Sequence, residues 1–158
     1  MPPQKEKNLP MAATLQEILL APDTQPEVAA DCYTLVEQQV SEMSGISGTA
    51  VKLAYKTVTA FMPGHVRFMI DSLMPHMVEE LEPFWADFRA CGGADFGDYL
   101  TKRSDEVSQS LLMVTDERAE ASGRPTIVRA YRSVRGGAGR HIQAALPRLG
   151  DIVVKYAG

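Results

Sequence analysis

The segment from Ile127 to Tyr156 contains the pattern that most constrains the fold of this chain. Apolar side chains recur along it at intervals of three or four residues. The set comprises Ile127, Tyr131, Val134, Ala138, Ile142, Ala145, Leu149, Ile152 and Tyr156. Because their mean spacing of about 3.6 residues is the period of an α-helix, we predict a long C-terminal helix with one apolar face. The glycines between Gly136 and Gly139 either weaken this helix or break it in two, and Pro147 is expected to kink it.

The rest of the sequence also has helical apolar spacing, and boundary residues divide it into a series of helices. No Asn-Gly or Asp-Gly turn separates alternating apolar runs. A second apolar helix face comprises Val28, Cys32, Leu35, Val36, Val40 and Met43. Helix boundaries are predicted at Thr14 with Glu17 as a capping box, Pro22, Gly45 with Ser47 as the next N-cap, Pro63-Gly64, Gly92-Gly93 and Ser104. The helix after Ser47 is expected to turn Val51, Val58 and Phe61 to one side.

These boundaries predict an all-α fold. We expect a single-domain helical bundle of about six to eight helices over residues 14–158, with a long kinked C-terminal helix. Residues 1–13 are interpreted as a flexible N-terminal tail. The chain has 158 residues, of which 45% are hydrophobic, and this is enough to form a core without metals or disulfides.

The cysteines and the hydropathy of the chain indicate the cellular compartment of the protein. Cys32 and Cys91 lie outside any metal-binding motif, so no zinc site is expected. The chain contains no apolar run long enough for a signal peptide or a transmembrane helix. Together these features predict a cytoplasmic protein without membrane insertion.

Charge is distributed unevenly along the chain. The formal net charge is −4, yet residues 123–158 contain seven Lys or Arg and a single acid, Asp151. A protein that coats nucleic acid is usually basic, so nucleic acid is not the expected partner. We expect the basic C-terminal residues to pair with acidic neighbours, either in the same chain or in a partner subunit. A strip that binds phosphate or acidic groups is the alternative.

The sequence contains no recognisable catalytic or cofactor-binding motif. The patterns HExxH, GxSxG and GxGxxG do not occur. His65, His76 and His141 are interpreted as capping or surface residues, and the acidic run 79–87 as a solvated face. We therefore expect no metal, no cofactor and no enzymatic activity. Residues 47–49 would form an ordinary helix cap or, alternatively, hold a phosphate.

The segment from His65 to Ala90 is the most apolar part of the chain. Pro75 and Pro83 are expected to divide or kink its helix. Within it lies a stripe of methionine and aromatic residues, namely Met69, Met74, Met77, Phe84 and Trp85. Such a stripe is typical of a core or a dimer seam. Because methionine adapts to irregular apolar surfaces, the alternative is a pocket lined by these residues for a small apolar ligand.

Arginines flank the apolar face of the C-terminal helix. In such positions they cover a helix–helix seam with their stems and pair with acids across it. The predicted partner-binding residues are Arg129, Arg132, Arg135, Tyr131, Ile142 and Tyr156. The leading expectation is a non-catalytic protein that acts through self-association or protein–protein interaction. A homodimer would form through this helix or through residues 65–88, and binding of an apolar ligand in the core is the alternative.

A third and weaker hypothesis is a helix-turn-helix that reads DNA. Such a motif needs a glycine in its turn and apolar residues at fixed sequence positions around it, and Val40, Gly45, Ile46 and Val51 meet this requirement. Residues 47–53 would then enter the DNA groove. Residues 24–62, however, carry four acidic and two basic side chains. This charge is poorly suited to phosphate contacts, which supply most of the affinity for DNA.

Short stretches distributed over most of the chain carry a family likeness. They are TLQEILL from Thr14, SGISGTAVK from Ser44, EPFW from Glu82, GADFGDYL from Gly93, RSDEV from Arg103, VTDER from Val114 and AALPRL from Ala144. These stretches resemble an uncharacterised family of small actinobacterial proteins, a domain of unknown function. The resemblance implies an intracellular bacterial protein, with residues 1–13 as an extension. It implies no activity, cofactor or catalytic residue.

Overall fold

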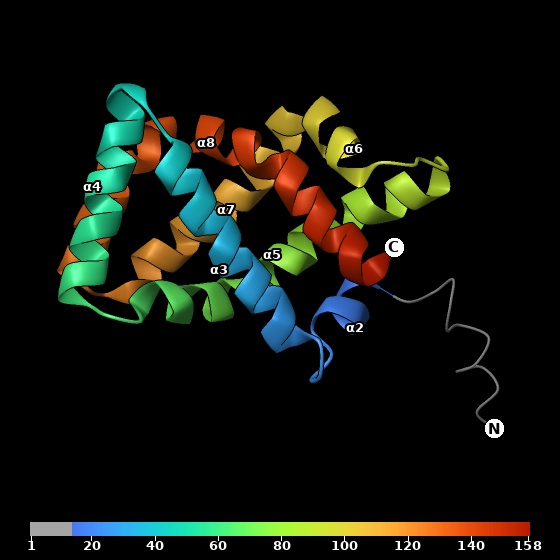
Figure 1. Ribbon diagram of the computed structural model, residues 1–158, viewed down its shortest axis with the longest axis horizontal. Coiled ribbons are helices and arrows are strands. Elements are labelled where there is room, and N and C mark those ends of the chain that lie inside the picture. Colours follow the sequence, from blue (N-terminus) through green and yellow to red (C-terminus); the bar gives the residue numbers. More distant parts are fainter. Residues whose placement is uncertain (1–13) are drawn as a thin grey trace.

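The computed structural model describes residues 14–158 and shows them as seven α-helices without a strand (Figure 1). In chain order the helices are α2 (Leu15–Leu19), α3 (Gln25–Glu42), α4 (Gly45–Phe61), α5 (His65–Ala90), α6 (Phe96–Lys102), α7 (Ser104–Ser122) and α8 (Pro125–Ala157). The prediction of an all-α fold with a long C-terminal helix is confirmed. The interpretation of residues 1–13 as a tail lies outside the described residues.

A carboxylate from α5 anchors the short helix α2. Thr14 and Glu17 form the predicted capping box. The Glu82 carboxylate accepts hydrogen bonds from the backbone N–H groups of Leu15 at 3.1 Å and Gln16 at 3.4 Å. A negative charge at a helix N-terminus satisfies free donors and interacts favourably with the helix dipole. Glu82 is therefore a structural cap, and its interpretation as part of a solvated face was wrong.

The turn between α3 and α4 lies earlier than predicted. Helix α4 begins at Gly45 with Ser44 as its N-cap, so the prediction of Ser47 was wrong. Gly45 has a φ of 78°, a left-handed conformation that glycine adopts without strain and that turns the chain before Ser47 is reached. At the other end of α4, Phe61 is 76% exposed whereas Val58 is buried, which contradicts the expectation that the two lie on one side of the helix.

Two long helices continue through prolines. Helix α5 is unbroken across Pro75 and Pro83, and α8 is unbroken across Pro147 and the glycines before it. Figure 1 shows α8 changing direction along its length, with its first half beside α4 and its second half beside α6. Packing against these neighbours offsets the cost of the interrupting residues. Within residues 14–158, no helix combines the length and apolar character needed to cross a membrane.

The tightest packing lies where α2 and α6 meet the second halves of α5 and α8, a region that we call the closed end. Phe96 and Leu100 of α6 have no exposed surface. The rings of Phe96 and Trp85 meet edge to face with centroids 5.0 Å apart. The α6 and α8 backbones approach so closely that a Cβ on Gly150 would lie 2.4 Å from the Cα of Gly97. Glycine is therefore required at this crossing.

Candidate functional site

An apolar cavity of ≈ 420 Å³ lies among α3, α4, α5, α7 and α8. All six members of the predicted α3 face line it, namely Val28, Cys32, Leu35, Val36, Val40 and Met43. Seven of the nine members of the α8 pattern also line it, namely Tyr131, Val134, Ala138, Ile142, Ala145, Leu149 and Ile152. The two apolar faces predicted from sequence are therefore two walls of one cavity. Ordinary helix pairs interdigitate such faces and leave little space between them.

Helix α5 supplies a third wall and separates the predicted ligand-binding residues into two groups. Met74 and Met77 line the cavity, whereas Met69, Phe84 and Trp85 are not among its lining residues. Trp85 is buried in the aromatic cluster of the closed end, and Met69 and Phe84 are half-buried elsewhere on α5. The prediction thus grouped residues that lie on different faces of one long helix.

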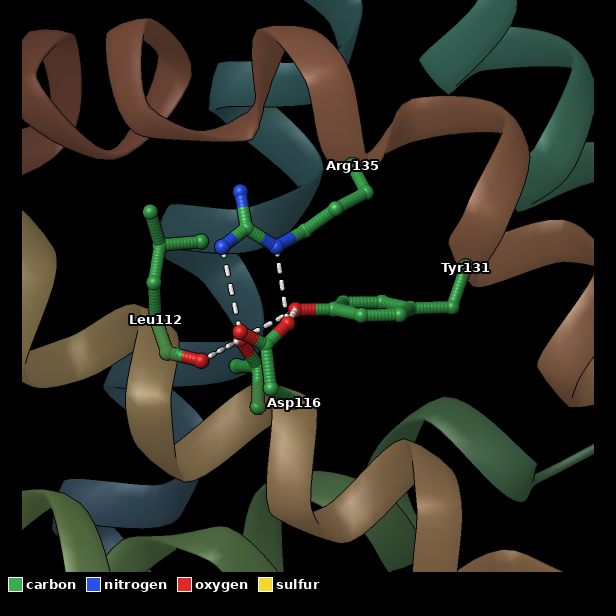
Figure 2. Close-up of polar contacts among 5 residues, drawn as sticks. Leu112, Asp116, Tyr131 and Arg135 are labelled. Atoms are coloured by element: carbon green, nitrogen blue, oxygen red, sulfur yellow. Dashed lines mark hydrogen bonds and ion pairs between the residues drawn. The ribbon is translucent and has the colours of Figure 1, made fainter.

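A polar cluster between α7 and α8 borders the cavity (Figure 2). The Tyr131 hydroxyl donates a hydrogen bond to the Asp116 carboxylate at 2.5 Å and lies 2.7 Å from the Thr115 hydroxyl. Arg135 donates to both oxygens of the same carboxylate, from Nε at 2.8 Å and from Nη2 at 3.1 Å. This bidentate geometry is the strongest common form of a charged hydrogen bond.

The electrostatics of this cluster make it a structural clasp. The hydrogen bonds from Arg135 and then from Tyr131 hold the pKa of Asp116 below its usual value. Burial, together with the hydrogen bond to Asp116, raises the pKa of Tyr131 to about 12. At neutral pH the phenol is therefore protonated and the carboxylate is ionised. Neither group is poised to exchange a proton with a bound molecule.

The other polar side chains at the cavity are also paired. His141 Nε2 of α8 lies 3.2 Å from Ser47 Oγ of α4. Gln39 of α3 accepts a hydrogen bond from Arg148, which also forms an ion pair with Glu42 at 2.9 Å. Among residues 14–158, no buried side-chain nitrogen or oxygen lacks a hydrogen-bond partner. The cavity therefore presents mainly hydrocarbon to a guest.

Cys32 is the one cysteine on the cavity wall. Burial, with a smaller contribution from the Asp31 charge, raises the pKa of its thiol to about 11. Because the thiolate is the nucleophile, Cys32 is a weak one at neutral pH. In the part of the chain that the structure describes, His, Cys, Asp and Glu side chains form no group of three that could hold a metal ion.

Comparison with protein families identifies the family of this chain. The model of DUF6918, a family of unknown function, matches residues 15–157. The chain belongs to this family. No curated protein and no solved structure matches it. The match to DUF6918 extends from α2 to the end of α8, so every helix that lines the cavity lies within it. The resemblance to a domain of unknown function is thereby confirmed.

The predicted partner-binding residues of this DUF6918 protein separate into two groups. Arg129 and Arg132 are exposed. The others contact neighbouring helices of the same chain, and they are Tyr131, Arg135, Ile142 and Tyr156. Tyr156, for example, donates a hydrogen bond to Asp31 of α3 at 2.6 Å, and Lys155 pairs with the same carboxylate at 2.8 Å. These basic C-terminal residues thus meet acids within one chain, which is one of the two predicted arrangements.

Sequence reasoning missed the polar residues on the cavity wall of the DUF6918 fold. His141 was interpreted as a capping or surface residue, yet it lines the cavity. It follows Ala138 by three residues and precedes Ala145 by four, so helical spacing places it on the same face. Gln39 stands in the same relation to Val36 and Met43. A search that ignored polarity and used spacing alone would have found both.

Proposed function

We propose that this protein binds a small, predominantly apolar molecule in its cavity and does so without catalysing a reaction. The observation that carries the proposal is the pair of apolar faces on α3 and α8 that border ≈ 420 Å³ of space. Small-molecule sites commonly have volumes in this range. A guest restores the dispersion contacts that the lining side chains otherwise lack, so an apolar cavity favours an apolar guest.

The polar lining restricts the chemistry of the ligand. The Tyr131 hydroxyl and the His141 ring are already hydrogen-bonded within the chain. A strongly polar ligand would have to break these pairs or leave its own groups without partners, and either change costs free energy. We therefore infer a ligand with an aliphatic or aromatic body and at most one polar group, placed beside Tyr131 or His141.

The other functional hypotheses have less support in the geometry. A homodimer seam along the apolar face of α8 would need Tyr131 and Ile142, which already line the cavity. A helix-turn-helix would pack Ile46 between its helices, whereas Ile46 is 94% exposed. For the compartment we infer the cytoplasm, because Cys32 and Cys91 are free thiols, the usual state in a reducing environment.

Uptake of the neutral apolar dye N-phenyl-1-naphthylamine tests the binding proposal. A fluorescence titration compares the natural protein with the double variant Ala138→Leu/Ala145→Leu, in which both leucines occupy the cavity. The matched control is Ala144→Leu, which adds the same side chain at the neighbouring exposed position. We expect saturable binding of the dye to the natural protein and to the control. In the double variant a guest would overpack the core, so the affinity for the dye should fall by at least about tenfold.

Native mass spectrometry of the protein, purified gently from its own cells, then identifies a resident molecule. An adduct that the dye displaces would support the proposal. Equal dye affinity in all three proteins, or no saturable uptake by the natural protein, would contradict it. Circular dichroism confirms that the double variant keeps its helical content, so that lost binding is not mistaken for lost folding.

A further inference from the structure

Helix α4 is apolar on two opposite sides, although it stands at the margin of the molecule (Figure 1). Its inner side packs Val51 and Val58 toward the rest of the fold. Its outer side leaves Ile46 94% and Leu53 65% exposed, and Phe61 at its end is 76% exposed. A helix that is hydrophobic all round is ordinarily buried. The outer side of α4 therefore has the composition of a surface that another body covers.

Four large apolar residues of α4 and of the start of α5 are exposed, and we call them the α4 patch: Ile46, Leu53, Phe61 and Phe68. Ile46 and Leu53 are seven residues apart, two helical turns, and so lie on one side of α4. Phe68, in the first turn of α5 after the short connection, is 60% exposed. Single exposed apolar residues are common on proteins, but a group of large ones marks an interaction surface.

The charge around the α4 patch identifies the kind of partner. Helix α4 carries Lys52 and Lys56 and no acid. It packs against α8, whose first half, residues 124–140 with the N-cap, contains five arginines and no acid. Of these arginines, Arg135 is paired with Asp116. The two segments are therefore basic on a protein whose formal net charge is −4, and we call them the basic edge. Helix α4 also contacts α3, where Glu42 is paired with Arg148 and Glu37 faces Tyr55.

We propose that the α4 patch docks on an anionic lipid surface. The apolar side chains would enter the headgroup region, and the exposed Lys52 and Lys56 would contact lipid phosphates. A second copy of this chain fits less well, because a twofold interface would bring two basic edges together. Nucleic acid would suit the lysines but would leave Ile46 and Leu53 without apolar contacts. The inference goes beyond ligand binding and does not require an occupied cavity.

Flotation with lipid vesicles tests the apolar part of the α4 patch. The purified full chain is mixed with vesicles of phosphatidylcholine alone, or of phosphatidylcholine with phosphatidylglycerol. The test variant is Ile46→Ser/Leu53→Ser, and the control is Met113→Ser, which changes a 60% exposed methionine on α7. We expect binding to the anionic vesicles only, a drop of about tenfold or more in the test variant, and no change in the control.

The charged part is tested with a second pair of variants. Lys52→Gln/Lys56→Gln should weaken anionic-vesicle binding by about fivefold for each lysine removed, and added salt should weaken binding of the natural protein. Lys102→Gln on α6 is the control, because this exposed lysine lies outside the basic edge. All changed positions are exposed, and thermal unfolding confirms that each variant is folded.

Three outcomes would overturn the inference. The first is that the protein binds neither kind of vesicle. The second is a dimer in light scattering that Ile46→Ser/Leu53→Ser dissociates while vesicle binding is absent, which would assign the patch to a second copy. The third is binding to duplex DNA that depends on Lys52 and Lys56 without vesicle binding. None of these outcomes bears on dye uptake, so the ligand-binding proposal is tested separately.

Discussion

The two ends of the molecule are held together in different ways. At the closed end, Phe96 and Leu100 are fully buried, and the backbones of α6 and α8 touch at Gly97 and Gly150. Toward the other end, which we call the hollow end, α3, α4, α5, α7 and α8 surround the cavity, and its lining on α8 extends from Tyr131 to Val153. Polar pairs such as Asp116–Arg135 join the helices there. One end is stabilised by packing, whereas the other combines polar clasps with empty space.

Helix α8 runs through both ends, so its sequence pattern can be compared with the packing at each. Its predicted apolar face lines the cavity for most of its length. The residues with the least exposure on its second half, Leu146 at 0% and Val153 at 1%, are not members of that face, yet they also border the cavity. Periodicity therefore identifies an amphipathic helix, but it does not reveal how completely the opposite side is filled.

The largest expected effect on stability comes from replacing a buried leucine, and the comparison takes one leucine from each end. Leu100→Ala should lower the free energy of unfolding by about 3 to 5 kcal/mol, because it empties a filled site. Leu73→Ala, on the cavity wall, should cost less than about 2 kcal/mol, because Leu73 already borders empty space and loses fewer contacts. Urea unfolding measures both values. Equal losses would show that the two ends are packed alike.

Two glycines of α8 give the next comparison. At Gly150 an added Cβ would meet the backbone of Gly97 at 2.4 Å, so Gly150→Ala should destabilise the protein by about 1 to 3 kcal/mol. At Gly136 nothing lies within 4 Å of an added Cβ. Gly136→Ala should instead stabilise the helix by about 0.5 to 1 kcal/mol. Thermal unfolding should shift Tm in opposite directions, and a common direction would contradict the close backbone contact.

The clasp at the hollow end should have a smaller effect. Tyr131→Phe keeps the ring on the cavity wall and removes the hydroxyl that bonds Asp116 and lies beside Thr115. The expected loss is about 1 kcal/mol, the usual contribution of one hydrogen bond. Urea unfolding again gives the value. Unchanged stability would mean that the polar pair does not help to join α7 and α8.

The smallest expected effect is a loss of stability at acidic pH. Hydrogen bonds from Arg135 and Lys155, followed by those from Tyr131 and Tyr156, lower the pKa values of Asp116 and Asp31. Their stabilisation is present above the ordinary Asp pKa of about 4 and is lost as pH falls through the lower folded-state values. Solvent screening keeps the contribution small because the paired side chains are between 30% and 59% exposed.

The measurement for this prediction is Tm from neutral pH down to strongly acidic pH. The natural protein should lose more of its Tm on acidification than the double variant Asp116→Asn/Asp31→Asn, which no longer has these carboxylates. The difference should shrink at high salt if exposed ion pairs are responsible. Parallel curves for the two proteins would assign acid sensitivity to other groups.

Local signals made much of the fold predictable. The Thr14–Glu17 capping box and the helical spacing of α3 and α8 depend on neighbouring residues only, and the structure has both. The cap that Glu82 supplies to α2 was not predictable in this way, because its two partners are 66 and 67 residues away in sequence. Such a contact is created by the fold and leaves no local pattern.

The candidate site was predictable in its walls but not in its volume. Met74 and Met77 follow from apolar spacing, as do most of the lining residues of α8. Trp85 belongs to the same sequence stripe, but α6 covers it and includes it in the closed end. Whether facing side chains meet or leave a cavity depends on the separation of helices, which tertiary packing sets.

Helix α4 is bounded by glycines in the left-handed conformation, Gly45 with φ 78° and Gly64 with φ 81°. It packs mainly against α8 and supplies Val51 to the cavity wall. A segment that packs mainly against one helix and has such a turn at each end can detach locally while the rest of the fold stays intact. The rate of exchange with the cavity would then follow the opening of α4, so residence time and affinity could be changed independently.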